Sequence, residues 1–242
     1  CSRNNISLMY ANIDVDELNR PLSLPSMLLD ERIDGVIVVG ALLEETIDHI
    51  SNRTKEKVVL VDAYTSIGNE FDSVLIDNVN GAMKAVGYLI AKGHRDIGLI
   101  GSYPNSYPSI LERRMGYLTT IAQHHLEPFI EDSPLTRHDA YHATKRLITR
   151  VPKLTAIFAC NDDVAMGVAD ALQEMGLHIP TDISVVGFDD IDLVQELKPA
   201  LTTMHVDKLL MGVMAVRHLL DRAVNPNRTP LKTLVNTQLI ER

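Results

Sequence analysis

The sequence has few cysteines and no long apolar runs. Among its 242 residues only Cys1 and Cys160 are cysteines, so it can form neither a disulfide framework nor a zinc-binding spacing. This usage is typical of a protein that works in a reducing cytoplasm. No apolar run approaches the roughly 20 residues of a membrane span, and no secretory signal pattern is present, so we expect no membrane association.

Basic residues are scarce relative to acidic ones. The 23 lysines and arginines stand against 32 aspartates and glutamates, which gives a net charge of −9. Binding to nucleic acid phosphates needs a basic face, so this part of the protein is not expected to grip DNA by itself. Because the chain begins at Cys1 rather than at a methionine, we interpret it as a fragment, and a basic DNA-binding segment fits elsewhere in a longer protein.

Motifs of enzymes and cofactor sites are also lacking. Ile97–Gly101 does not carry the GxGxxG fingerprint, and no GxxxxGK[ST] loop is present, so nucleotide binding is unsupported. No GxSxG elbow and no Ser/His/Asp arrangement can be assigned. The nine histidines include no HExxH, and the adjacent His124 and His125 cannot face one ion from the same side of a helix. We therefore expect no catalysis, no cofactor and no metal.

The most informative stretch that is present is Leu154–Ile191. Thr155–Ala159 is a short apolar run typical of a buried strand, and Asn161 then starts a helical pattern with acidic residues in its first turn. Ile183–Gly187 is a second buried strand that delivers Asp189 at its carboxyl end. Ligands of parallel α/β sheets bind at that end, so the polar groups after the two strands are expected to lie side by side at a crevice.

The same alternation of strand and helix runs through the whole chain. It predicts an α/β fold of doubly wound parallel sheets with helices on both faces. Roughly eight to ten strands could form one large sheet, a barrel or two smaller sheets, and the break at Ser102–Ser109 favours two sheets with a cleft between them. Besides those in Leu154–Ile191, the predicted strands are Asn5–Ile13, Asp34–Gly40, Lys57–Asp62, Phe71–Ile76, Asp96–Gly101, Leu201–Val206 and Thr233–Ile240, and the predicted helices are Leu24–Ile33, Glu44–Lys55, Asn80–Lys92, Glu112–His124, Thr136–Arg150 and Lys208–Arg222.

An ordered set of short motifs carries a family resemblance. The set resembles the effector-binding domain of LacI/GalR-type bacterial transcription regulators, from about Asn5 to the C-terminus. Each motif alone is loose, but their order is specific. The motifs are Asp77-Asn-Val-Asn-Gly81, Tyr88-Leu-Ile-Ala-Lys-Gly-His94, Glu112-Arg-Arg-Met-Gly-Tyr117, Phe158-Ala-Cys-Asn-Asp162, Ala165-Met-Gly167, Ile179-Pro-Thr-Asp-Ile-Ser-Val-Val-Gly-Phe-Asp-Asp190 and Leu201-Thr-Thr203.

This resemblance implies a periplasmic-binding-protein-like fold with a small effector bound between two α/β subdomains. It places residues 1–101 and 202–226 in an N-terminal subdomain, and residues 102–201 and 227–242 in a C-terminal one. The helix-turn-helix headpiece, the hinge and the first strand and helix of the family are absent, so the first subdomain is expected to be incomplete. A homodimer is implied, with operator DNA bound only through the missing headpiece.

The resemblance also assigns effector contacts. Asp189 aligns with the acidic contact of the family, and a carboxylate at a strand end can accept two hydroxyl hydrogen bonds from a polyol. The alternative is that Asp189 caps the next turn, a role that we expect instead for Asp190. Asn161 resembles another contact and suits a vicinal hydroxyl pair, although it could equally cap the following helix, as Asp162 is expected to do.

Contacts are implied elsewhere as well. Arg113 aligns with the effector-contacting arginine of the family, and its planar guanidinium can hold a hydroxyl, carboxylate or phosphate at two points. Its neighbour Arg114 is expected to be solvated or ion-paired. Asp62 looks like the facing contact from the first subdomain. The remaining candidates are aromatic residues on cleft-side loops, which could stack on an apolar sugar face or simply pack in their loops; they are Tyr64, Tyr103 and Tyr107.

The expected function is therefore the effector-binding and dimerisation domain of a DNA-binding transcription regulator that senses a sugar or a related small polar metabolite. The alternative is a solute-binding protein of a sugar transporter, which shares the fold. An export signal and a monomeric state would support the transporter protein, whereas an upstream helix-turn-helix would exclude it.

Overall fold

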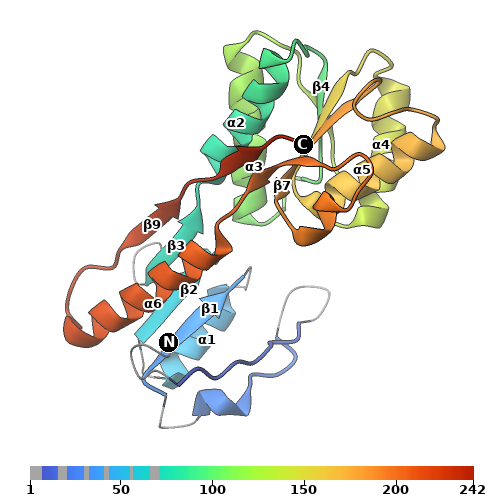
Figure 1. Cartoon of the computed structure of the whole chain (residues 1–242). Coiled ribbons are helices and arrows are strands. Elements are labelled where there is room, and N and C mark those ends of the chain that lie inside the picture. Colours follow the sequence, from blue (N-terminus) through green and yellow to red (C-terminus); the bar gives the residue numbers. More distant parts are fainter. Residues whose placement is uncertain (1–6, 16–20, 30–32, 41–43, 55–56, 66–70) are drawn as a thin grey trace. The chain divides into compact units, whose positions relative to one another are not determined.

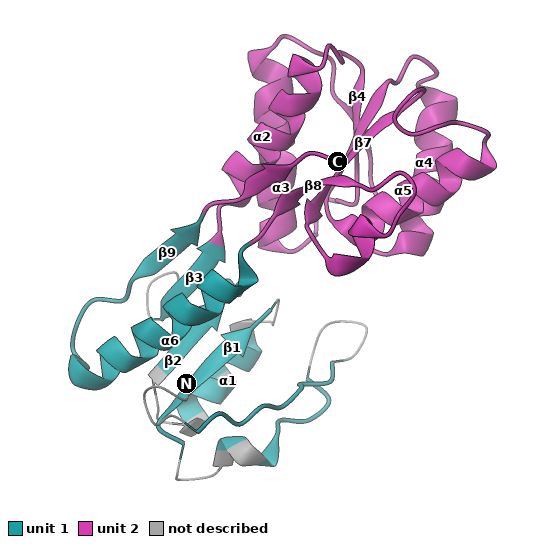
Figure 2. Cartoon of the chain, in the orientation of Figure 1, with its two compact units in different colours: residues 1–75, 207–235 teal, residues 76–206, 236–242 magenta. Residues whose placement is uncertain are grey.

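The structure, a computed structural model, describes residues 7–15, 21–29, 33–40, 44–54, 57–65 and 71–242. The chain divides into two compact units (Figure 2). Unit 1 comprises Cys1–Leu75 and Asp207–Val235, and unit 2 comprises Ile76–Val206 and Asn236–Arg242. The chain therefore passes between the units three times, after Leu75, after Val206 and after Val235.

Unit 1 is built on a four-stranded sheet with the order β1-β2-β3-β9. The first three strands are parallel and rich in β-branched residues, as suits strands that are buried between layers. The long helix α6 packs on β1 and β2. The elements are the 3₁₀ turn η2 (Ser26–Leu29), β1 (Gly35–Val39), α1 (Glu44–Thr54), β2 (Lys57–Val61), β3 (Asp72–Ile76), α6 (Lys208–Val224) and β9 (Lys232–Val235).

Unit 2 has a six-stranded sheet with the order β10-β8-β7-β6-β4-β5. Its strands are parallel except for β10, which runs antiparallel to β8. Helices α2 and α3 pack against each other on one face, and α4 and α5 on the other (Figure 1). The elements are α2 (Asn78–Ala91), β4 (Ile97–Ile100), α3 (Pro108–Gln123), β5 (Phe129–Glu131), α4 (Arg137–Arg150), β6 (Ala156–Ala159), α5 (Asp162–Glu174), β7 (Ser184–Asp189), the 3₁₀ turn η3 (Asp192–Gln195), β8 (Thr202–His205) and β10 (Gln238–Ile240).

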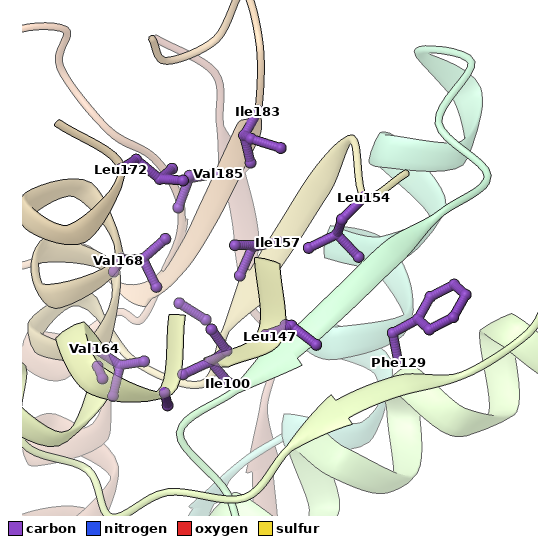
Figure 3. Close-up of a cluster of buried hydrophobic side chains, with 14 of the residues drawn as sticks. Ile100, Phe129, Leu147, Leu154, Ile157, Val164, Val168, Leu172, Ile183 and Val185 are labelled. Carbon is purple, nitrogen blue, oxygen red and sulfur yellow. The ribbon is translucent and has the colours of Figure 1, made fainter. Parts of the chain in front are cut away.

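The core of unit 2 forms where α4 and α5 cover the sheet (Figure 3). Leu147 of α4 and Leu172 of α5 are fully buried against Ile157 of β6, and each such side chain contributes about 1.5–3 kcal/mol through burial. The two helices approach closely at Gly167, where an added Cβ would lie 2.1 Å from the carbonyl oxygen of Arg137. This close packing fixes the N-terminus of α5 next to the end of β6.

The prediction of two parallel-sheet α/β subdomains is confirmed, but the predicted boundaries were wrong in three places. Residues 202–206 belong to unit 2 and not to unit 1, because β8 pairs with β7. Residues 76–101 belong to unit 2, because β4 pairs with β5 and β6 and because α2 packs against α3. The single strand predicted at Thr233–Ile240 is in fact two strands in different sheets. β9 joins the sheet of unit 1 and β10 joins that of unit 2, so residues 227–235 lie in unit 1.

Two further predictions failed near the N-terminus. Residues 7–13 of the predicted strand Asn5–Ile13 form no strand, and Asn5 and Ile6 lie outside the described residues. Of the predicted helix Leu24–Ile33, only the 3₁₀ turn η2 appears in the described part. An alternating apolar pattern forms a strand only when a neighbouring strand takes up its backbone hydrogen bonds, and residues 7–13 pair with no strand of the described chain.

Candidate functional site

Three predicted site residues come together in unit 2. Asp189 is the last residue of β7, Asn161 lies two residues after the end of β6, and these neighbouring parallel strands end at the same edge of the sheet. Arg113 reaches this edge from α3. The structure thus brings Arg113 and Asp189 into direct contact, and it places Asn161 at the end of the adjacent strand.

The guanidinium of Arg113 is buried, and each of its three nitrogens donates a hydrogen bond within its own chain. It is 3% exposed and lies 3.8 Å from the centre of the Phe188 ring. Its Nη2 donates to Asp189 Oδ1 at 3.0 Å, its Nε donates to Asn78 Oδ1 at 2.9 Å, and its Nη1 donates to the carbonyl oxygen of Cys160 at 2.6 Å. Arg113 therefore holds the carboxylate of Asp189 in one orientation.

The end of β7 carries two consecutive residues with left-handed backbone. The φ angles are +105° at Asp189 and +49° at Asp190, in a region that non-glycine residues seldom adopt. The side chain of Asp189 remains 27% exposed. The capping role predicted for Asp190 was wrong, because Asp190 bonds His205 at 2.9 Å and Arg242 at 2.7 Å, while η3 has Ile191 at its N-cap without a side-chain bond.

Asn161 and Asp162, at the start of α5, have the reverse of the capping roles that were predicted for them. Asn161 caps α5, since its Oδ1 accepts from the Val164 amide at 2.8 Å. Asp162 does not cap the helix. Its Oδ2 accepts from the Ile191 amide at 2.9 Å and its Oδ1 from the Thr203 hydroxyl at 2.6 Å. These partners come from the loop after β7 and from β8, so no local sequence pattern points to them.

The remaining candidates are more dispersed. Tyr103 and Tyr107 lie in the loop before α3 and keep 39% and 41% of their surface exposed. Asp62 and Tyr64 follow β2 in unit 1, so a contact of Asp62 with an effector held by unit 2 stays a prediction. Arg114, expected to be solvated or ion-paired, pairs with Asp132.

Sequence reasoning missed two buried residues beside the site. Asn78 bridges the site to α3, because its side-chain nitrogen donates to Glu112 while its oxygen accepts from Arg113. Cys160 offers its carbonyl oxygen to Arg113, and burial raises the pKa of its thiol to about 12. Asn78 stood in a motif of the family resemblance, but that motif assigned it no contact in the site.

Metal and membrane sites have no support in the described ranges. No group of three or more histidine, cysteine, aspartate or glutamate side chains there is arranged to hold a metal ion. No helix in that part of the chain is long and apolar enough to cross a membrane.

Comparison with known proteins identifies the class to which this fold belongs. Residues 86–242 match the model of the periplasmic binding protein-like domain. The whole chain is 30% identical over 247 residues to the HTH-type transcriptional repressor PurR of Yersinia enterocolitica and covers 72% of that protein. The chain belongs to the LacI family of transcription regulators and is an effector-binding domain of that family.

Solved structures give the same result for the fold. The complex of the transcriptional regulator CelR with cellobiose is 25% identical and superposes with a TM-score of 0.81, over 90% of this chain and 67% of that chain. The lac repressor dimer bound to operator and the anti-inducer ONPF is 24% identical with a TM-score of 0.75, over 87% of this chain and 63% of that chain. The relatives named here are transcription regulators, which is the class that the motifs in the sequence indicated.

Proposed function

We propose that this domain binds a small hydroxyl-bearing effector and that Asp189 is its principal contact in unit 2. The supporting observation is that the Asp189 carboxylate is held by Arg113 yet remains 27% exposed. A carboxylate fixed in this way can accept two hydroxyl hydrogen bonds without losing further side-chain freedom. The similarity to a regulator solved with cellobiose supports a sugar or a related polyol.

The charges at this edge favour an uncharged effector. The Arg113 guanidinium that contacts Asp189 is buried and already makes three hydrogen bonds to its own chain, so its charge is shared among groups of the protein. Asp190 is paired with Arg242, and Asp162 adds a further buried carboxyl group. Within the described residues, a phosphate at Asp189 would therefore face these carboxylates, while Arg113 and Arg242 are already paired with them. Arg113 serves in this proposal as the group that orients Asp189.

The other candidates complete the proposed site. The capping bond of Asn161 uses its side-chain oxygen, and its side-chain NH2 group could donate to the effector. Tyr103 and Tyr107 could stack on a sugar ring. Asp62 and Tyr64 would contact the effector from unit 1. An effector that binds one arrangement of the two units better than another shifts the population toward it, and a full two-state switch needs about 5.5 kcal/mol of such preference.

The full regulator is proposed to act as a cytoplasmic homodimer that binds operator DNA through a helix-turn-helix segment outside this chain. The relatives support this assembly, since one is an HTH-type repressor and another is a dimer bound to operator. A transporter's solute-binding protein is a less suitable alternative, because the relative matched along the whole chain is a repressor.

A thermal-shift screen tests the proposal, because a ligand that binds only the native state raises its melting temperature. Neutral sugars, nucleosides and the phosphates of the same sugars are compared at equal concentration. We expect stabilisation by neutral compounds and little by their phosphates. Asp189→Ala should weaken binding by about 1.5–3 kcal/mol, whereas Asp192→Ala, an exposed carboxylate on the following turn, should leave it unchanged. Equal affinity for both variants would remove Asp189 from the site.

A further inference from the structure

Asp162 is a buried carboxyl group close to the proposed contact, and within the described chain its hydrogen-bond partners include no cation. It is 1% exposed and bonds the Ile191 amide through one oxygen and the Thr203 hydroxyl through the other. These bonds link the start of α5 to the loop after β7 and to β8. Burying a carboxyl group costs free energy, and Asp162 does not cap α5, so its burial indicates another role.

The backbone of β7 is shaped to receive this carboxyl group. Gly187 lies two residues before Asp189, and an added Cβ at Gly187 would come within 2.3 Å of Asp162 Oδ1. Any side chain at this position would therefore displace the carboxyl group from its seat. The close approach ties Asp162 to the strand that ends in the proposed effector contact.

The turn that follows β7 has a strained backbone, which interactions with the surrounding structure must stabilise. Two consecutive aspartates with positive φ, Asp189 and Asp190, cost about 1–3 kcal/mol each in backbone strain unless the surroundings hold them. Arg113 holds the side chain of Asp189, and Arg242 holds that of Asp190. The next backbone amide, that of Ile191, is held by Asp162.

We propose that Asp162 is a positioning residue for Asp189, which fixes the strained turn through the Ile191 amide and thereby aims the Asp189 carboxylate at the effector. Asp162 itself does not touch the effector. The inference rests on the proposed function for its consequence, whereas the anchoring of the turn can be tested without any ligand.

The surroundings of Asp162 also define a conservative replacement. The charged groups that face it are Asp189 and Asp190, while β8 presents the Thr203 hydroxyl and the turn presents the Ile191 amide. An asparagine can accept from that amide with its oxygen and donate to the hydroxyl oxygen with its nitrogen. Asp162→Asn therefore preserves both bonds, whereas Asp162→Ala removes both.

Hydrogen exchange of the free chain, followed at single amides by NMR, tests the anchoring. In Asp162→Ala the Ile191 amide should exchange about ten-fold faster than in the wild type, and in Asp162→Asn it should stay near the wild-type rate. Asp163→Ala is the matched control, since it removes an exposed carboxylate from the same helical turn. If Asp162→Ala exchanges no faster than this control, the inference is wrong. Should Asp162→Ala not fold, Thr203→Val gives a milder perturbation whose Ile191 rate decides in the same way.

Titration with cellobiose by calorimetry tests the consequence. We expect Asp162→Ala to bind about ten-fold more weakly than the wild type, with affinity restored in Asp162→Asn and unaffected in Asp163→Ala. Wild-type affinity in Asp162→Ala together with faster Ile191 exchange would overturn the link between the turn and the effector. If the wild type binds cellobiose but Asp189→Ala binds equally well, the proposed function of Asp189 fails, while the exchange rates still decide the role of Asp162.

Discussion

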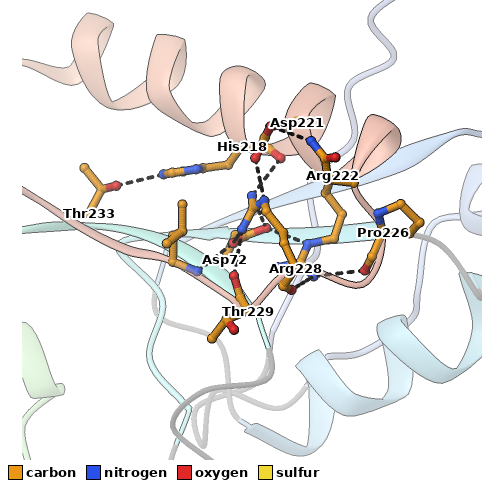
Figure 4. Close-up of polar contacts among 10 residues, drawn as sticks. Asp72, His218, Asp221, Arg222, Pro226, Arg228, Thr229 and Thr233 are labelled. Atoms are coloured by element: carbon orange, nitrogen blue, oxygen red, sulfur yellow. Dashed lines mark hydrogen bonds and ion pairs between the residues drawn. The ribbon is translucent and has the colours of Figure 1, made fainter.

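Two buried aspartates of this protein have opposite surroundings. Asp72 at the start of β3 is 0% exposed and lies among cations of unit 1 (Figure 4). Arg228 Nη1 donates to it at 2.7 Å, Arg222 Nε at 2.8 Å and the Leu231 amide at 2.7 Å. Burial alone would raise the pKa of Asp72, but the hydrogen bonds from Arg222 and Arg228 outweigh it and lower the pKa to about 2.

Asp162 is just as deeply buried but has only neutral donors. Burial raises its pKa to about 6, the bonds from Thr203 and Ile191 offset part of this rise, and the charges of Asp189 and Asp190 add to it. The comparison teaches that the partners of a buried carboxyl group, rather than its depth, decide which charge state the fold favours. The first aspartate serves as the centre of an ion cluster, and the second as an anchor whose carboxyl group ionises only near pH 6.

Removing the carboxylate of Asp72 should have the largest effect. Asp72→Ala leaves Arg222 and Arg228, which are 15% and 17% exposed, without their shared partner. We expect a loss of about 3–5 kcal/mol in the free energy of unfolding, measured by urea denaturation. Asp221→Ala removes a 49% exposed partner of Arg228 and should cost at most about 1 kcal/mol. A loss in Asp72→Ala no larger than in this control would contradict the role of the cluster.

The stability of Asp162→Asn relative to the wild type should increase as the pH rises. The folded-state pKa of about 6 lies above the ordinary 3.8, so the wild type loses stability between about pH 4 and pH 6, where its carboxyl group must ionise in a buried place. The amide escapes this loss. From pH 4 to pH 7 the stability difference should move in favour of the variant by about 3 kcal/mol. Denaturation series at the two pH values measure this, and a pH-independent difference would refute it.

For Asp72 in unit 1 the pH dependence of stability should run in the opposite direction to that for Asp162. The pKa of Asp72 is depressed to about 2 from the ordinary 3.8, so its stabilising contribution is complete above about pH 4 and is lost as the pH falls toward 2. This loss amounts to about 2.5 kcal/mol. Asp72→Asn should be less stable than the wild type at pH 5, and the gap should narrow by that amount at pH 2. A constant gap would show that folding does not lower the pKa of Asp72.

Thr203→Val should give the smallest effect. The substitution removes the hydroxyl that donates to Asp162 Oδ1 while keeping the shape of the side chain. We expect a loss of about 1 kcal/mol at pH 7, together with an upward movement of the pH at which Asp162 ionises. Thr203→Ser retains the hydroxyl and is the control. Identical pH profiles for the valine variant and the wild type would show that the bond does not matter for ionisation.

Much of the fold could be predicted from the sequence, because its strands and helices have strong periodic patterns. The strand, helix and strand of the segment Leu154–Ile191 were predicted correctly, since a buried strand, a capped helix and a second buried strand follow one another in the sequence. The three-residue strand β5 was missed because Phe129–Glu131 is too short to show a period. The sheet to which β4 and β9 belong depends on distant pairing, which no local pattern encodes.

The candidate site divides in the same way. Motifs that stand far apart in the sequence but in family order assigned Arg113 and Asp189 to one effector site, whereas the ion pair between them is seen only in the structure. The roles of Asn161 and Asp162 could not be separated, because either of these adjacent residues suits a helix N-terminus. What distinguishes Asp162 is Thr203, 41 residues later, and only folding brings the two together.

The thiol of Cys160 follows β6 and is completely buried, with its pKa raised to about 12. Because alkylating reagents attack the thiolate, Cys160 is inert while the surrounding strands remain closed. The rate at which Cys160 is alkylated therefore reports how often this region opens, without an introduced cysteine. An effector bound at the neighbouring Asp189 would lower this alkylation rate, so the rate could be used to measure effector binding.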